Sequence, residues 1–296
     1  MISLIYGSGF GIYGYLPAIY KFSKKIYLNK RYKETFKSRE ELALFEPKIV
    51  WYKNTKNIIS KIDYLVIAKR PFDQLKIVKQ VLKNKNKVKH VFLEKPISLS
   101  PKKTLNLLKI FEKTKANYSV GFLFEYVSWY SLIKKKIKNH KKTNIIIKWN
   151  IKKDLNKKFS WKYNHKEGGG LLRYYGIHFI KLFADLNFEI IKKNKITKDY
   201  WKISIDDKKH NTINVILRYS KISNFSYKID NLKTNKFKSP FLNEINYQSI
   251  DPRCFFLKKY IRKNLIKYNN NFKNLKVFLN IWSKIEIINF NAKKFL

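Results

Sequence analysis

Cysteine is almost absent from this chain of 296 residues, in which Cys254 is the only one. A lone cysteine cannot form an internal disulfide, and it excludes the paired-cysteine patterns that bind metal ions. The sequence therefore does not belong to the disulfide-built class of small secreted domains. A reducing, cytoplasmic location is the one we expect from this composition.

Long apolar runs are also missing. Residues 1–20 carry no charged side chain, but several glycines and Pro17 interrupt this stretch, and no basic segment precedes it. No later segment reaches the ~20 apolar residues that are needed to span a bilayer. We therefore expect a soluble chain without a signal peptide or a membrane span.

Acidic residues are scarce: 20 Asp and Glu stand against 65 Lys and Arg, which gives a formal net charge of +45. Such a charge would normally indicate a nucleic-acid ligand, because basic side chains displace counterions from phosphate. Here the lysines are scattered through nearly every segment, together with Asn, Ile, Tyr and Phe, whose codons are rich in A and T. Base-composition drift explains this bias without a nucleic-acid partner, although an attraction for anionic ligands remains.

Apolar residues are plentiful, at 45% of the chain, so two domains can each bury a core. The first half alternates short apolar strands with helical patterns, which is typical of a parallel α/β sheet. We expect helices from about residue 13 and over 72–82 and 102–113, and strands at 2–6, 25–28, 49–52, 64–68, 90–93 and 117–122. Residues 1–120 are thus predicted to form a Rossmann domain.

The second half has a different pattern. Strand-like segments follow one another with short turns and predict a mainly antiparallel sheet, with strands at 143–151, 188–194, 200–205, 212–219 and 224–229. Helical spacing covers residues 171–185 and about 271–290. We therefore expect residues 121–296 to form an α+β domain with an open sheet.

A glycine loop follows the first predicted strand, where residues 1–14 read MISLIYGSGFGIYG. Glycines allow backbone N–H groups to approach a pyrophosphate at the start of a helix. Two registers fit the G-x-G-x-x-G fingerprint. One starts at Gly9, and the other starts at Gly7 but leaves Ile12 at the third glycine position. The candidate cofactor-binding residues of this loop are Gly7, Gly9, Phe10, Gly11 and Gly14.

The end of the second predicted strand bears on the choice of cofactor. A carboxylate at this point would accept hydrogen bonds from the ribose hydroxyls of NAD, but no acidic residue occurs before Glu34. Instead, Asn29 can bond a ribose oxygen, and Lys30 or Arg31 can neutralise a 2′-phosphate. The sequence therefore favours NADP over NAD.

Two further motifs extend the argument beyond the glycine loop. Glu94-Lys95-Pro96 follows a predicted strand, and residues 168–178 read GGGLLRYYGIH. Together with VIAKRP at 66–71 and SVGF at 119–122, they resemble the family of glucose–fructose oxidoreductase, inositol dehydrogenase and the rhizopine-catabolism protein (Gfo/Idh/MocA). The resemblance covers nearly the whole chain. It implies a Rossmann domain joined to an α+β domain whose open sheet often forms an oligomer interface.

The resemblance also implies roles for single residues. Lys95 matches the family's active-site lysine, which hydrogen-bonds the reacting hydroxyl, and an ammonium stabilises a developing alkoxide. His178 matches the proton-transfer histidine, and an imidazole suits this role near neutral pH. Further candidates for the cofactor are Ala68, Pro71, Glu94 and Lys95 itself, on the nicotinamide side, and those for the substrate are Trp161, His165, Arg173 and Tyr174.

The sequence departs from the family at three positions. Members commonly carry an aspartate four residues before the histidine, where this chain has Tyr174. Its phenol, with a pKa of about 10, can bond a hydroxyl but cannot act as a carboxylate, and it remains a candidate catalytic residue. Gln74 replaces a histidine, and we expect it to change only the packing at the cofactor edge. Glu125 stands where relatives often carry arginine, and it is either a substrate-facing carboxylate or a solvated loop residue.

These observations predict an NAD(P)-dependent oxidoreductase that transfers a hydride between nicotinamide and a hydroxyl-bearing carbon of a sugar, nucleotide sugar or cyclitol. Two alternatives stay open. Tyr174 is compatible with a reductase of a C=C or C=N substrate, which needs a proton donor. The net charge is compatible with a non-enzymatic relative that binds a cofactor or a polyanion. No pattern predicts a metal site, and the family resemblance implies a homo-oligomer.

Overall fold

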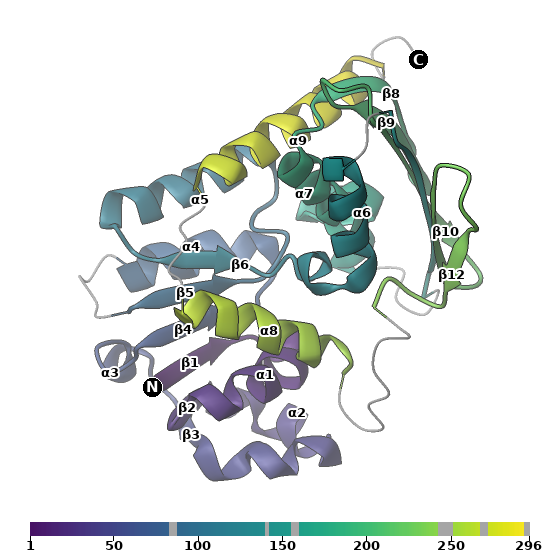
Figure 1. Cartoon of the computed structure of the whole chain (residues 1–296). Coiled ribbons are helices and arrows are strands. Elements are labelled where there is room, and N and C mark those ends of the chain that lie inside the picture. The colour runs from purple at the N-terminus through teal and green to yellow at the C-terminus, as the bar shows by residue number, and fades with distance from the viewer. Residues whose placement is uncertain (83–87, 140–141, 155–159, 242–250, 267–271, 293–296) are drawn as a thin grey trace. The chain divides into compact units, whose positions relative to one another are not determined.

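The chain folds into two compact units (Figure 1). The computed structural model describes residues 1–82, 88–139, 142–154, 160–241, 251–266 and 272–292. The first unit comprises residues 1–98, 102–123 and 246–270, and the second comprises 99–101, 124–245 and 271–296. The predicted fold class is confirmed, because one unit holds a parallel sheet and the other a mainly antiparallel one.

The first unit is built on a parallel sheet with the strand order β3-β2-β1-β4-β5-β6. The order reverses beside β1, so the carboxyl ends of β1 and β4 form the switch point at which such sheets bind ligands. Short apolar runs form these strands because helices cover both faces of the sheet. The strands are β1 (Ile2–Tyr6), β2 (Lys25–Asn29), β3 (Ile49–Tyr52), β4 (Tyr64–Ile67), β5 (His90–Leu93) and β6 (Tyr118–Val120).

Helices cover the two faces of this sheet, with α1 and α8 on one side and α4 and α5 on the other (Figure 1). The helix α8 packs against α1 although almost the whole of the second unit separates the two in sequence. The helices are α1 (Leu16–Ile19), α2 (Lys33–Lys37), α3 (Lys56–Ile59), α4 (Pro71–Leu82), α5 (Pro101–Thr114) and α8 (Arg253–Ile266), with 3-10 segments at η2 (Tyr20–Phe22), η3 (Lys30–Tyr32) and η4 (Glu40–Lys48).

The second unit is built on a sheet with the strand order β12-β11-β7-β10-β9-β8. Its neighbours pair antiparallel except β7 and β10, which are parallel. Side chains alternate along the strands, so that Ile145, Ile147 and Trp149 are buried while their neighbours face outward. The strands are β7 (Asn144–Lys152), β8 (Ile190–Ile196), β9 (Tyr200–Asp206), β10 (Thr212–Ser220), β11 (Asn224–Ile229) and β12 (Asn235–Phe237).

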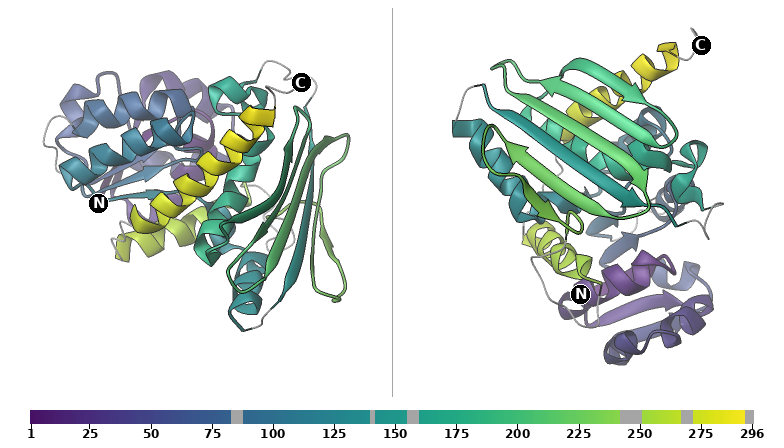
Figure 2. Two further views of the ribbon diagram at one scale, coloured as in Figure 1. Left: turned by 90° about the horizontal axis from the view of Figure 1, so that it is seen from above. Right: turned by 90° about the vertical axis from the view of Figure 1, so that its right-hand side faces the viewer.

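One face of this sheet packs on the helices α6 (Ser128–Asn139), α7 (Ile177–Leu186) and α9 (Phe272–Ala292). The other face is turned toward the viewer in the right-hand view of Figure 2, and none of the described helices lies over it. The apolar stripe of α9 is buried, with Phe278, Trp282 and Ile285 fully enclosed. No helix in the described part of the chain is long and apolar enough to cross a membrane.

Candidate functional site

The glycine loop after β1 brings the backbone close to the end of β4. Gly7 has a φ of +137°, and a Cβ at this position would lie 2.4 Å from the carbonyl oxygen of Ala68. A Cβ on Gly11 would lie 3.2 Å from Ile5 Cγ2 and 3.4 Å from Ala68 Cβ. Glycine is therefore required for the turn at Gly7 and for the close packing of the first helix on the strands.

The first helical turn, η1 (Gly11–Tyr15), is π-helical, because the N–H of Leu16 donates to the carbonyl of Gly11. A π turn contains one residue more than an α turn. In the register that starts at Gly7, the third glycine would stand at Ile12, but Gly11 makes the close contact instead. The extra residue in the turn offsets this shift of one position.

The start of α8 closes over the glycine loop, a feature that sequence reasoning missed. The ring of Phe10 covers Gly14, and the guanidinium of Arg253 lies 4.3 Å from the centroid of that ring. Asp251 accepts two hydrogen bonds from the guanidinium of Arg253, at 2.9 and 2.6 Å, and one from its backbone N–H at 3.0 Å. Cys254 Sγ lies within donating distance of the carbonyls of Tyr13, at 3.2 Å, and Gly14, at 3.4 Å, and burial raises the pKa of this thiol to about 12. The thiol is therefore protonated and holds α8 against the loop.

The Glu94-Lys95-Pro96 turn follows β5 and carries a partly buried acid. The hydroxyl of Tyr15 donates to Glu94 Oε2 at 3.0 Å. Burial raises the pKa of Glu94 to about 7, although Lys95 and Arg253 oppose this shift. A Cβ on Gly121 would lie 3.1 Å from Glu94 Oε2 and 2.7 Å from the Tyr15 hydroxyl. The glycine of the SVGF motif therefore makes room for this pair.

The buried amide of Gln74 holds the same turn from the first residues of α4. Its Nε2 donates to the carbonyl oxygen of Glu94 at 2.8 Å and to that of Pro96 at 2.9 Å. These two carbonyls flank Lys95, so one amide fixes the backbone on both sides of the lysine. Gln74 thus does more than change the packing at the cofactor edge.

Two cations meet beside the end of β2. Asn29 Oδ1 accepts the backbone N–H of Arg31, whose Nη2 donates to the hydroxyl of Tyr32 at 3.0 Å. The Arg31 guanidinium lies 5.0 Å from the centroid of the Tyr32 ring, and Lys69 Nζ lies 5.6 Å from the same centroid. Lys30 is exposed. Lys69 is a residue that sequence reasoning did not select, although its place after β4 was visible in VIAKRP.

In the second unit, the glycine triplet joins a loop to the turn before His178. Gly168 and Gly170 have φ values of +85° and +80°, and a Cβ on Gly169 would collide with the carbonyl oxygen of Trp161. The turn η9 (Leu171–Gly176) follows and is again π-helical. The triplet therefore packs the backbone of Trp161 directly against the segment that leads into α7.

This packing brings Trp161 and Tyr174 together. Their rings meet edge to face, with 5.4 Å between centroids, and Lys162 Nζ lies 5.7 Å from the Tyr174 ring. His178 follows one turn later in α7 and is buried. The ring of Phe124 stacks on the imidazole, with 4.1 Å between centroids and 17° between the planes.

The remaining substrate candidates have partners within the second unit. Arg173 donates to both carboxylate oxygens of Glu286 in α9, at 2.6 and 2.8 Å, and to the carbonyl of His165 at 2.9 Å. The side chain of His165 is exposed. Glu125 Oε1 lies 2.8 Å from Lys181 Nζ. Arg173 therefore ties the loop and η9 to α9, and Glu125 belongs to an ion pair.

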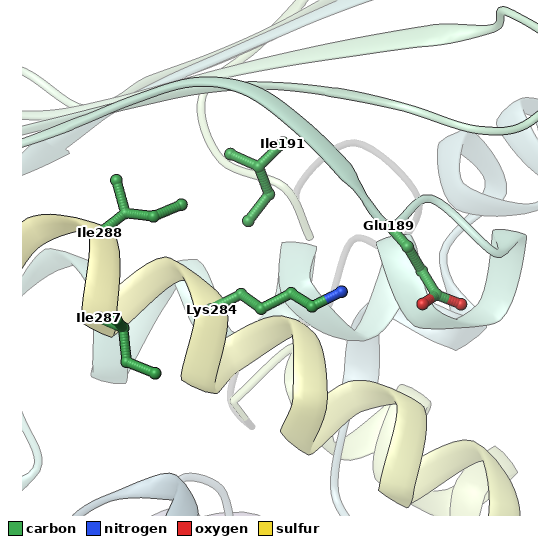
Figure 3. Close-up of a pocket in the computed structure, with 5 residues that line it drawn as sticks. All are labelled: Glu189, Ile191, Lys284, Ile287 and Ile288. Atoms are coloured by element: carbon green, nitrogen blue, oxygen red, sulfur yellow. The ribbon is translucent and has the colours of Figure 1, made fainter.

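A groove of about 220 Å³ lies between α9 and β8 (Figure 3). None of the candidate site residues lines it, and its lining is Glu189, Ile191, Lys284, Ile287 and Ile288. In the part of the chain that the structure describes, no group of three or more His, Cys, Asp or Glu is placed to hold a metal ion.

The model of an oxidoreductase family with an NAD-binding Rossmann fold, GFO_IDH_MocA, matches residues 3–122. The match lies in the N-terminal part of the chain, which is thus similar to the Rossmann domains of Gfo/Idh/MocA oxidoreductases. Glucose-6-phosphate 3-dehydrogenase of Bacillus subtilis (strain 168) is 29% identical over 171 residues, which are 53% of this chain and 48% of that protein. The chain thus matches about half the length of this curated relative.

Solved structures share the fold over nearly the whole chain. The WlbA (WbpB) dehydrogenase from Thermus thermophilus, in complex with NAD and UDP-GlcNAcA, has a TM-score of 0.67 at 14% identity and covers 95% of this chain and 92% of its own. A 3-ketoreductase from Actinomadura kijaniata, solved with NADP, has a TM-score of 0.68 at 10% identity, with 96% and 95% covered. A myo-inositol dehydrogenase from Corynebacterium glutamicum ATCC 13032 has a TM-score of 0.64 at 11% identity, with 96% and 94% covered.

Proposed function

We propose that this chain is an NAD(P)-dependent oxidoreductase that transfers a hydride between nicotinamide and a hydroxyl-bearing carbon of a sugar, nucleotide sugar or cyclitol. The observation that carries the proposal is the Lys95 turn, which Gln74 fixes from both sides at the carboxyl edge of a Gfo/Idh/MocA Rossmann sheet. The relatives support the substrate class, since they include a sugar-phosphate dehydrogenase and a dehydrogenase crystallised with a nucleotide sugar.

The residues of the first unit fit a dinucleotide. A side chain at Gly7 would collide with the end of β4 and one at Gly11 would be tightly packed against the strands, and the loop precedes a helix N-terminus that favours an anion. Loop residues Gly9 and Phe10 would contact the pyrophosphate, and Gly14, Ala68 and Pro71 remain proposed cofactor-binding residues. The bound nicotinamide supplies the hydride chemistry.

The preference for NADP over NAD rests on cations. The Arg31 guanidinium and Lys69 Nζ lie 5.0 and 5.6 Å from the centroid of the Tyr32 ring, and positive charge around this ring would suit the 2′-phosphate. Asn29 would hydrogen-bond the ribose, and the exposed Lys30 would add positive charge near the 2′-phosphate. Lys69 is an addition to the residues selected from the sequence.

The side chains of both units have separate tasks in the proposed reaction. The ammonium of Lys95 would hydrogen-bond the reacting oxygen and stabilise negative charge on it. The imidazole of His178 would take or give the hydroxyl proton. Tyr174 would bond a substrate hydroxyl, and its ring and that of Trp161 offer apolar surface to a sugar. The neighbouring His165 and Arg173 remain proposed substrate contacts.

The test is a fluorescence titration with NADPH and NADH, followed by a screen of sugars, nucleotide sugars and cyclitols with the cofactor that binds more tightly. We expect Lys95→Met and His178→Gln to lower kcat by roughly 100-fold or more, and His178→Gln to leave the affinity for the cofactor unchanged. The exposed Lys102→Met is the matched control for the lysine. Turnover at the normal rate in both variants would refute the proposal.

A second candidate is a reductase of C=C or C=N bonds, which the tyrosine at position 174 favours because a phenol can donate a proton. Consumption of NADPH with an imine or enone, while all sugars fail, would select this candidate. Salt-sensitive binding of nucleic acid without nicotinamide binding would instead select a non-enzymatic polyanion-binding protein.

We also propose that two copies of this chain associate through the face of the second sheet that no described helix covers (Figure 2). This face carries Ile146, Ile216 and Tyr200 among polar side chains, all partly exposed. Ile216→Glu should shift the sedimentation coefficient to that of a monomer, and an unchanged value would refute this interface. A cytoplasmic location remains a prediction from the single cysteine.

A further inference from the structure

A buried charge network begins one helical turn after His178. Lys181 Nζ lies 2.8 Å from Glu125 Oε1 and 2.5 Å from Asp185 Oδ1. The hydroxyl of Tyr130 donates to the other oxygen of Asp185 at 2.6 Å. The relative solvent exposure of Lys181 is only 8%. The network joins the 3-10 segment η5 (Leu123–Tyr126), α6 and α7 at one point.

The charged groups in this network stabilise one another's ionised states. Burial alone lowers the pKa of Lys181, but the carboxylates of Glu125 and Asp185 outweigh it, so the pKa lies above its ordinary value. Burial and the nearby Asp185 raise the pKa of Tyr130, which therefore keeps the proton that it donates. Buried ion pairs add little to stability compared with apolar residues of similar volume, so stability is a poor explanation of this network.

The network connects to His178 through Phe124. Phe124 precedes Glu125 in η5, and its ring stacks almost parallel on the imidazole at 4.1 Å. The torsion that orients a histidine ring has broad minima, so the plane of the ring is set by what packs on it. Phe124 is buried and also packs edge-on against Trp129 and Phe179, and the Glu125–Lys181 ion pair is the polar contact that joins its segment to α7.

We propose that the network of Glu125, Lys181, Asp185 and Tyr130 positions His178 by holding the ring of Phe124 against the imidazole. The inference rests on the proposed function, in which His178 transfers a proton. Orientation matters for this step because the ring nitrogen must lie within hydrogen-bond reach of the reacting hydroxyl. A displacement of about 1 Å can lower a rate roughly 100-fold.

The imidazole itself provides the readout, because the chain contains five histidines and ¹⁵N-histidine labelling gives a simple spectrum. His178→Gln assigns the signal. We expect Glu125→Gln and Lys181→Met to shift or broaden the His178 signal and to leave the other four unchanged. The control is Asp199→Asn, which removes the carboxylate of an exposed ion pair with Lys153 in the same unit. A His178 signal that is identical in folded Lys181→Met and in the parent protein would overturn the proposal.

Kinetics separate a positioning role from a structural one. We expect kcat to fall roughly 10- to 100-fold in Glu125→Gln, with the KM for substrate and the affinity for NADPH unchanged. If Lys181→Met does not fold, substitutions of Phe124 provide the test instead. Phe124→Leu should move the His178 signal and Phe124→Tyr should restore it, and equal signals in both would overturn the proposal. Undiminished turnover in His178→Gln would refute the proposed catalytic role, whereas the NMR comparison tests the positioning without any substrate.

Discussion

Replacing Gln74 with leucine tests how the lysine turn is held. Leucine has a similar volume but removes the two hydrogen bonds to the carbonyls of Glu94 and Pro96. Each buried acceptor that loses its donor costs about 1–3 kcal/mol. Part of this loss is offset, because Gln74 Oε1 has no hydrogen-bond partner among the described residues and is removed as well. We therefore expect the free energy of unfolding to fall by about 1–3 kcal/mol.

Urea denaturation followed by circular dichroism measures this change. Gln80→Leu is the matched control, because Gln80 lies in the same helix but is exposed, and we expect its effect to be within about 0.5 kcal/mol. Loss of the two Gln74 hydrogen bonds should also lower kcat about tenfold, because Lys95 is then held less firmly in position. If Gln74→Leu is as stable as the parent and equally active, the amide does not position the turn.

Three further substitutions in the first unit are predicted to have distinct effects. Gly7→Ala should abolish NADPH binding in a fluorescence titration, since its Cβ would meet the carbonyl oxygen of Ala68 at 2.4 Å, and an unchanged affinity would contradict this role of the turn. Lys69→Ala should weaken NADPH roughly tenfold and leave NADH unchanged, and an equal loss for both would contradict a 2′-phosphate contact. The pKa of Glu94 is raised to about 7 in the folded state, so the folded state binds more protons than the unfolded state. The contribution of this group to stability is therefore full below about pH 4. It is lost as the pH rises through 7. The stability of Glu94→Gln relative to the parent should therefore increase over this range, and a constant difference would show that the carboxyl titrates normally.

All strands except β12 and most of the long helices could be predicted from the sequence because their apolar residues have the period of the element they form. The glycine loop was also predictable, although its register was not. Gly11 contacts the strands because the first turn is π-helical, and no spacing rule distinguishes a π turn from an α turn.

The contacts that hold the candidate site were not predictable, because they join residues that are remote in sequence. Gln74 acts on carbonyls about 20 residues away, and Lys181 pairs with Glu125 across two elements. Glu125 was identified as a possible substrate ligand because a single sequence shows a carboxylate but not its partner. The sequence cannot distinguish Lys69 from the other 64 of the 65 basic residues, whereas the structure places it beside the ring of Tyr32.

The path of the chain limits how the nucleotide-binding region can be engineered. The segment that matches the family ends at residue 122, but Tyr260, in the much later α8, bonds the Ser119 hydroxyl at 2.7 Å and packs edge-on against Phe92. A fragment cut after residue 122 would expose the apolar sides of these strands and of α1. A chimaera that transfers this nucleotide-binding unit to another substrate domain therefore needs two segments of the chain, residues 1–122 and the much later α8.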